Sequence, residues 1–155
     1  MEKFFVSPEV SFLYALKTNY LKRNISEIEK SLILISNLLE QKKYGTVVDS
    51  LTEIVRSNRF SYFRGEVYLL LAEAYYYQND FDSALVFAQK AIGEKSKSET
   101  WVSPFAYYFA SAACVKKADM EKAKYYFDKV DDFSGFFYEN KMKSMLKNLN
   151  RSIKN

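Results

Sequence analysis

The sequence predicts an all-α fold, and three observations lead to this prediction. The chain of 155 residues contains only 4 Gly and 2 Pro, whereas a many-stranded sandwich or barrel needs such residues at its turns. Apolar residues recur at helical spacing between short polar breaks, and helix-capping signals precede several of these segments. Hydrophobic residues make up 48% of the chain, enough for one compact core. We therefore expect residues 1–155 to form a single domain.

The first two helices are predicted from their start signals. Ser7 is a suitable N-cap, Pro8 takes the first helical position, and Glu9 lies in the first turn, where the helix dipole favours an acid. This pattern predicts an N-terminal helix over residues 7–23. Ser26 and Glu29 have the spacing of a capping box and so predict the start of the next helix.

An arrangement of large, small and aromatic residues occurs three times along the chain. The clearest copy contains Tyr68, Ala72, Tyr75, Phe81, Ala84, Ala88 and Ala91. A second copy contains Tyr107, Ser111, Cys114, Met120, Ala123, Phe127 and Val130. A looser copy, earlier in the chain, contains Ile35, Leu38, Tyr44, Val47, Leu51 and Ile54. The period is 37 residues from Val47 to Ala84 and 39 residues from Ala84 to Ala123.

This frame resembles the tetratricopeptide repeat, a helical hairpin of about 34 residues. The resemblance covers residues 28–137, with hairpins expected over 28–61, 65–98 and 104–137. The periods exceed the usual spacing, and the proline that usually closes each repeat is missing. The resemblance implies a right-handed superhelix of antiparallel helical hairpins, an α-solenoid, which needs a terminal cap. A generic helical bundle with alanine-rich seams is the alternative.

Residues 138–154 are predicted to form the C-terminal capping helix. Its apolar residues form one stripe: Tyr138, Met142, Met145, Leu146, Leu149 and Ile153. Residues 139–155 hold five basic residues and one acidic residue, a local charge of +4 that equals the net charge of the chain. Either this face is solvated, or it contacts an acidic partner, nucleic acid or an anionic membrane surface. Clustered Lys with few Arg is weak evidence for nucleic-acid recognition, and we do not expect it.

The resemblance also implies a peptide-binding groove, lined by the first helix of each hairpin. The residues predicted to line it are Leu32, Leu39, Glu66, Leu69, Glu73, Tyr76, Tyr77, Phe105, Tyr108 and Lys116. Tyr75 is expected to fill the core instead. Tyrosine suits peptide recognition because it combines a large apolar ring with a polar hydroxyl. Positions that grip a terminal carboxylate in chaperone-binding members of the family are apolar here, so we expect no carboxylate clamp. The N-terminal helix or a second copy of the protein are competing occupants of the groove.

The residue inventory argues against enzymes and cofactors. The chain has no His, which removes the commonest general base and zinc ligand. Neither a phosphate-binding loop nor a nucleophile with its base is found, so we expect no catalytic, metal or cofactor site. Cys114 is the single cysteine and is expected to be a buried core thiol. No apolar run is long enough to span a membrane. The first residues do not resemble a signal peptide, which favours a reduced cytoplasmic or nuclear setting.

Two functions are compatible with these observations. The first is a non-catalytic protein–protein interaction module or scaffold that binds a partner peptide or helix in an apolar, aromatic groove. The alternative is an assembly subunit whose aromatic surface mediates homodimerisation within a larger complex. The oligomeric mass of the protein distinguishes the two.

Overall fold

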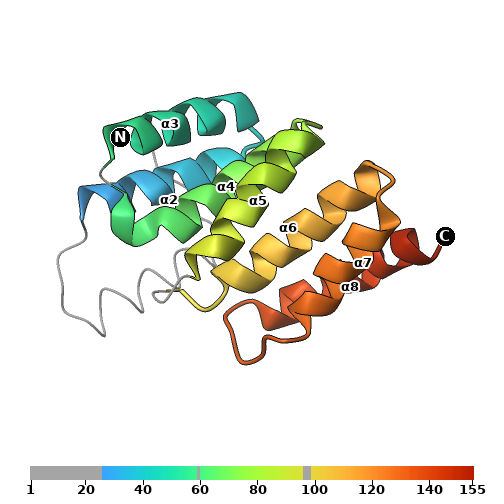
Figure 1. Cartoon of the computed structure of the whole chain (residues 1–155). Helices are drawn as coiled ribbons and strands as arrows, with labels where there is room; N and C mark the ends of the chain where they lie inside the picture. Colours follow the sequence, from blue (N-terminus) through green and yellow to red (C-terminus); the bar gives the residue numbers. More distant parts are fainter. Residues whose placement is uncertain (1–25, 59, 96–98) are drawn as a thin grey trace. The chain divides into compact units, whose positions relative to one another are not determined.

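The computed structural model describes residues 26–58, 60–95 and 99–155. Within these ranges the chain forms seven α-helices and one 3-10 helix, with no strand (Figure 1), which confirms the all-α prediction. The helix predicted over residues 7–23 lies outside the described residues. The described chain divides into two compact units: an N-terminal unit with residues 26–58 and a C-terminal unit from Phe60 to Asn155. None of the described helices is both long and apolar enough to cross a membrane.

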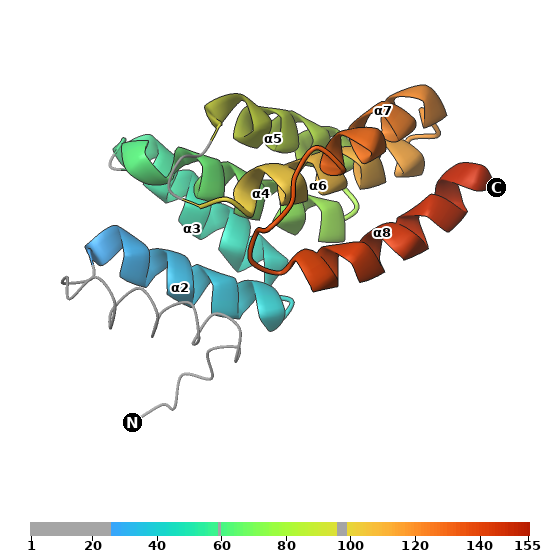
Figure 2. The same cartoon turned by 90° about the horizontal axis from the view of Figure 1, so that it is seen from below.

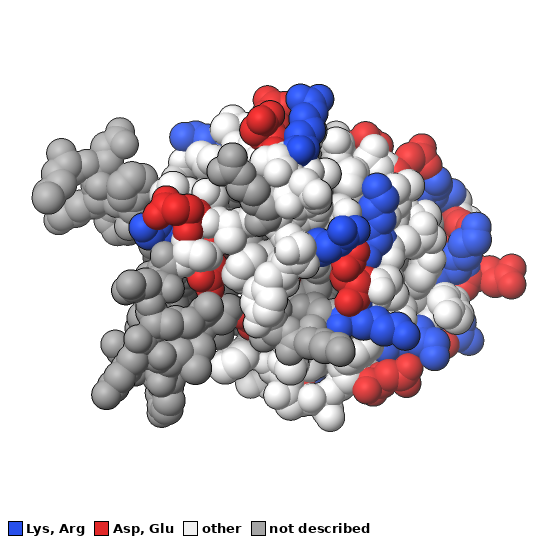
Figure 3. Space-filling model, turned by 60° about the vertical axis from the view of Figure 1, so that its left-hand side comes forward, with Lys and Arg blue, Asp and Glu red and all other residues white. Residues whose placement is uncertain are grey.

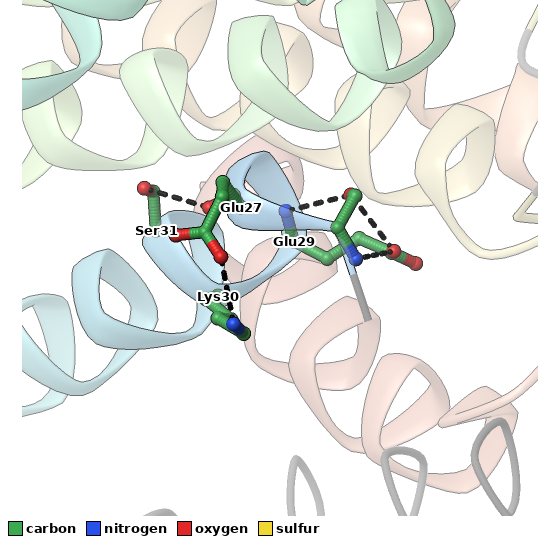
Figure 4. Close-up of polar contacts among 5 residues, drawn as sticks. Glu27, Glu29, Lys30 and Ser31 are labelled. Atoms are coloured by element: carbon green, nitrogen blue, oxygen red, sulfur yellow. Dashed lines mark hydrogen bonds and ion pairs between the residues drawn. The ribbon is translucent and has the colours of Figure 1, made fainter. Parts of the chain in front are cut away.

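The N-terminal unit contains a pair of helices that pack together, α2 (Glu27–Glu40) and α3 (Tyr44–Ser57). The predicted capping box is present at the start of α2 (Figure 4). The backbone N–H of Glu29 donates to Ser26 Oγ at 3.3 Å, and the backbone N–H of Ser26 donates to Glu29 Oε2 at 3.0 Å. These bonds satisfy two donors that the first turn of a helix otherwise leaves without partners.

The C-terminal unit contains a 3-10 turn, Ser61–Phe63, and five α-helices. The helices are α4 (Arg64–Tyr77), α5 (Phe81–Glu94), α6 (Val102–Lys116), α7 (Met120–Val130) and α8 (Glu139–Lys154). From α4 to α7, each helix packs against the next one along the chain, and α4 also packs against α6. Helix α8 packs against both α6 and α7 (Figures 1 and 2). This packing is consistent with a helical repeat in which α4 and α6 are neighbouring first helices.

The turn inside each helix pair has the same geometry. A residue in the left-handed conformation stands at Lys42 (φ 60°), Asn79 (φ 64°) and Ala118 (φ 59°). The next residue along the chain then donates its N–H to the carbonyl five residues earlier. These bonds are Lys43 to Leu38 at 2.9 Å, Asp80 to Tyr75 at 3.0 Å and Asp119 to Cys114 at 3.0 Å. Each turn therefore closes with a Schellman-type bond, and the turns recur after 37 and 39 residues, the periods of the sequence frame.

The second helix of each pair begins differently in the two units. In the C-terminal unit, Asp80 accepts a hydrogen bond from the backbone N–H of Ser83 at 3.1 Å. Asp119 accepts the equivalent bond from Lys122 at 3.2 Å. In the N-terminal unit, Lys43 occupies the corresponding position and makes no side-chain cap. Because an N-cap carboxylate stabilises a helix by about 1 kcal/mol, α5 and α7 have better-defined starts than α3.

Small residues form the seams between paired helices. Ala72 and Ala84 are fully buried in the α4/α5 hairpin, as are Ser111 and Ala123 in the α6/α7 hairpin. The Ser111 hydroxyl donates to the carbonyl oxygen of Ala123 at 2.6 Å. Cys114, one turn later on α6, is also buried, and burial is the main cause that raises the pKa of its thiol.

The third hairpin has a shorter second helix than the other two. Helix α7 has 11 residues, whereas α3 and α5 have 14 each. Asp131 and Asp132 follow its last residue, where acidic side chains oppose the helix dipole. The connection to α8 then passes across α6 (Figure 2). It brings the ring of Tyr138 to 6.4 Å from the ring of Phe105, near the start of α6.

Helix α8 packs through part of its predicted apolar stripe. Met142 and Leu149 are buried, and the other four members of the stripe are half-buried. Its five basic residues are all exposed: Lys141, Lys143, Lys147, Arg151 and Lys154. Lys143 forms an ion pair with Glu139 at 2.9 Å. The helix therefore has the polar outer face and apolar inner face that a cap requires.

Candidate functional site

The predicted groove residues come from both units. Leu32 and Leu39 lie on α2 in the N-terminal unit, where both are buried. The other eight residues lie on α4 and α6 in the C-terminal unit. A site built from contacts seen in the structure therefore uses α4 and α6 alone.

The eight residues on α4 and α6 differ in exposure. Glu66, Leu69 and Phe105 are buried. Phe105 packs against Tyr138, and also against Trp101, whose ring lies 6.3 Å away. Lys116 is exposed at the last position of α6. The remaining four are Glu73, Tyr76 and Tyr108, which are half-buried, and Tyr77, which is 45% exposed.

The run Tyr75-Tyr76-Tyr77 points in three directions because successive residues of a helix are about 100° apart. Tyr75 stacks on Phe87 of α5 with a ring separation of 5.5 Å, as expected for a residue that fills the hairpin. Tyr76 makes edge-to-face contacts with Phe81 and with Phe109. Tyr77 is the most exposed of the three tyrosines. The same tripeptide therefore contributes to the core and to the surface.

Tyr76, Tyr77 and Tyr108 come together around Phe109, and we call these three residues the tyrosine cluster. The ring of Phe109 lies 5.7 Å from that of Tyr76, 6.4 Å from that of Tyr77 and 5.3 Å from that of Tyr108. The rings of Tyr76 and Tyr77 are 5.5 Å apart. All four contacts are edge-to-face, an arrangement that aromatic pairs favour. The packing of α4 against α6 thus holds three tyrosine rings around one buried phenylalanine.

The surroundings of the cluster raise the pKa of two of its hydroxyl groups, those of Tyr76 and Tyr108. The pKa of Tyr108 is raised to about 12, chiefly because the side chain is buried. Tyr76, Tyr77 and Glu73 each add a smaller electrostatic contribution that also raises this pKa. Burial raises the pKa of Tyr76 as well. The hydroxyl groups of Tyr76 and Tyr108 are therefore neutral phenols, able to donate and accept hydrogen bonds, and the Glu73 carboxylate acts on that of Tyr108.

Phe109 was not among the predicted groove residues, although it supports the cluster. In the sequence frame, Phe109 is one of the apolar residues at positions where tetratricopeptide proteins that bind a terminal carboxylate have polar residues. Its contacts with Tyr76 and Tyr77 cross from α6 to α4, and helical periodicity within one segment does not reveal contacts between helices. From the sequence, the apolar side chain of Phe109 indicated only that this residue would be buried.

Outside the tyrosine cluster, the surface features relevant to possible chemistry are charged and exposed aromatic side chains. Within residues 26–58, 60–95 and 99–155, no three His, Cys, Asp or Glu side chains are grouped so that they could hold a metal ion. On the face shown in Figure 3, Lys or Arg side chains lie next to Asp or Glu side chains, and uncharged residues occupy the centre. A second exposed tyrosine, Tyr125 on α7, is 57% exposed. It lies outside the tyrosine cluster and is a suitable control position.

Comparisons with protein-family models, with characterised proteins and with solved structures found no significant match for this chain. No site is therefore transferred from a relative. The candidate site depends on the contacts between α4 and α6.

Proposed function

We propose that this protein is a non-catalytic interaction module of the tetratricopeptide type, which binds a peptide or helix of a partner protein at the tyrosine cluster. The observation that carries the proposal is the packing of Tyr76, Tyr77 and Tyr108 around Phe109 at the contact between α4 and α6. The repeated turns at Lys42, Asn79 and Ala118 support the repeat type.

The physical basis of the proposal is the partial exposure of rigid aromatic rings. Contacts with Phe109 hold the rings in place before a ligand binds, so little conformational entropy remains to be lost. Tyr77 still exposes 45% of its surface, which a partner side chain would cover. Tyrosine is among the residue types that contribute most to binding at interfaces. The cluster combines these properties with neutral hydroxyl groups for hydrogen bonding.

The test compares two single substitutions at exposed tyrosines, Tyr77→Ala in the cluster and Tyr125→Ala on α7. Partners are first captured from lysate, and the affinity of each purified partner is then measured by calorimetry. We expect Tyr77→Ala to weaken binding about 30-fold, as for a residue that contributes about 2 kcal/mol. Tyr125→Ala should leave the affinity unchanged, and both variants should melt close to the wild-type temperature.

A different outcome would point to the assembly role. Light scattering across a dilution series gives the mass of the protein, which is 18.2 kDa for one chain. A dimer that persists on dilution, and that Tyr77→Ala dissociates, would mean that a second copy occupies the cluster. A partner that binds both variants equally well would place the binding surface elsewhere.

A further inference from the structure

Helix α8 carries a row of basic side chains along its exposed face. Lys147, Arg151 and Lys154 are separated by four and three residues, so they lie within about 60° of one another around the helix axis. The row spans a rise of about 10 Å along the helix. All three residues are exposed. We call these three residues the basic stripe.

No acidic side chain pairs with the basic stripe. Lys143, one turn earlier, forms an ion pair with Glu139, but none of the ion pairs among the described residues involves a member of the stripe. Helix α6 has no Asp or Glu, and the two acidic residues of α7, Glu121 and Asp128, form no ion pair with α8. The stripe therefore presents three unpaired positive charges, in a segment whose charge of +4 equals that of the whole chain.

The packing of α8 fixes the direction in which the stripe points. Met142 and Leu149 are buried, and at about 100° per residue they lie on the opposite side of the helix from the stripe. Helix α8 packs against α6 and α7, and Figure 2 shows no other helix of the C-terminal unit on its outer side. The stripe is therefore held on the surface before any ligand binds.

The composition of this face favours an acidic protein segment over other anionic ligands. An amphipathic helix binds a membrane through its apolar face, and that face of α8 packs on α6 and α7. Single-stranded nucleic acids stack on aromatic side chains beside the basic ones, whereas the neighbours of the stripe on this face are Asn140, Ser144 and Asn150. A helix with carboxylates spaced by four and three residues repeats the rise between the three positive charges.

We propose that the basic stripe is a second interaction surface, which binds an acidic helix of a partner protein through carboxylates spaced by three and four residues. Each member of the stripe pairs with one carboxylate. Because exposed ion pairs are weak and are screened by salt, this surface contributes more to the rate and selectivity of association than to affinity. The inference does not depend on the tyrosine cluster.

The test measures the binding of two synthetic helical peptides of about 16 residues to the full-length chain by fluorescence anisotropy. Both peptides contain three Glu among Ala and Gln. In the first peptide the Glu residues are spaced by four and three residues, and in the second they are distributed around the helix. We expect the first peptide to bind about tenfold more tightly at about 50 mM salt, as three exposed ion pairs allow. This preference should vanish at about 1 M salt.

Two triple variants identify the surface that binds the peptides. The stripe variant, Lys147→Gln with Arg151→Gln and Lys154→Gln, should bind both peptides equally. The control variant loses the same three positive charges at exposed lysines outside α8 and should keep the preference: Lys43→Gln, Lys95→Gln and Lys124→Gln. Both variants should melt close to the wild-type temperature, because every substituted side chain is exposed.

Several results would overturn the inference. Equal binding of the two peptides by the wild type would mean that the spacing of the stripe is not read. A preference that survives in the stripe variant would place the acidic helix elsewhere, and equal losses in both triple variants would leave only an effect of net charge. Poly(U) RNA or phosphatidylserine vesicles that bind the wild type more tightly than the first peptide, and fail to bind the stripe variant, would assign the stripe to nucleic acid or to a membrane surface instead.

Discussion

The two hairpins of the C-terminal unit share one plan but differ in three places. Both have a left-handed residue in the turn, an Asp N-cap on the second helix, and small buried residues at the seam. The α6/α7 hairpin differs from α4/α5 in its turn residue, its seam and the length of its second helix. The hairpin geometry therefore depends on a few positions, and the residues between them are free to build a surface.

The two hairpins bring their paired helices close together with different seam residues. In α4/α5, the seam residues Ala72 and Ala84 are fully buried and both have methyl side chains. In α6/α7, the hydroxyl of Ser111 fills the equivalent place and donates to the carbonyl of Ala123. Since a buried hydroxyl without a partner would be destabilising, this hydrogen bond makes serine tolerable where the other hairpin has alanine.

The largest expected effect on stability comes from replacing a small residue of either seam by a larger one. Ala84→Leu should destabilise the protein by about 1–3 kcal/mol because the site has no space for the added atoms. Ala123→Leu should cost about 1 kcal/mol more, because movement of α7 also breaks the bond from Ser111. Urea unfolding measures both, with Val86→Leu at an exposed position of α5 as the control. Equal losses at the two alanines would mean that the Ser111 bond survives the enlargement.

An effect of intermediate size on the free energy of unfolding is expected at high pH. It arises at Tyr108, a position where the two hairpins also differ. Tyr108 corresponds to Leu69 in the preceding hairpin, so only α6 carries an ionisable group there. Its pKa is raised from 10.0 to about 12, so the unfolded chain loses this proton first as pH rises. The stabilisation is complete below pH 10 and is lost between pH 10 and about 12, by about 2 kcal/mol.

Two variants test this loss of stability at high pH. Tyr108→Phe should lose less stability than the wild type between pH 10 and 12 in chemical unfolding experiments. Tyr125→Phe removes an exposed tyrosine instead and should follow the wild type. If Tyr108→Phe shows the same pH dependence as the wild type, Tyr108 ionises as readily in the folded protein as in the unfolded chain.

The smallest expected effect concerns the turn residues. Ala118 has φ 59°, and this conformation costs a residue with a Cβ atom about 1 kcal/mol. Ala118→Gly should therefore raise stability by somewhat less than about 1 kcal/mol, since glycine also increases the entropy of the unfolded chain. Asn79→Gly should gain less because Asn tolerates this conformation. Thermal melting would refute this account if Ala118→Gly melted below the wild type.

Features that depend on neighbouring residues in the chain were predictable from the sequence. The capping box of Ser26 and Glu29 follows from a spacing of three residues, and the structure contains it. The periods of 37 and 39 residues predicted from alanine and valine positions match those of the turns at Lys42, Asn79 and Ala118. The groups that form the capping box lie within one short segment of the chain, and so do the groups that form each turn.

Features that depend on packing between distant segments were harder to predict from the sequence. The sequence frame placed Tyr76, Tyr77 and Tyr108 on neighbouring first helices, and the structure holds them around Phe109. It gave no indication that Tyr138, 33 residues further along, would cover Phe105. That contact depends on the early end of α7 and on the path of the connection to α8, which no periodic pattern encodes.

Because Cys114 is buried, the rate at which a thiol reagent labels it reports local opening of the structure around α6. A thiol reagent reacts only with an accessible thiolate, and this thiol is 1% exposed. Labelling must therefore wait until α6 separates from the helices packed against it, which are α4, α5, α7 and α8. At saturating reagent the labelling rate then equals the rate of that opening. Because the chain has no other cysteine, the wild-type protein reports this motion without an engineered probe.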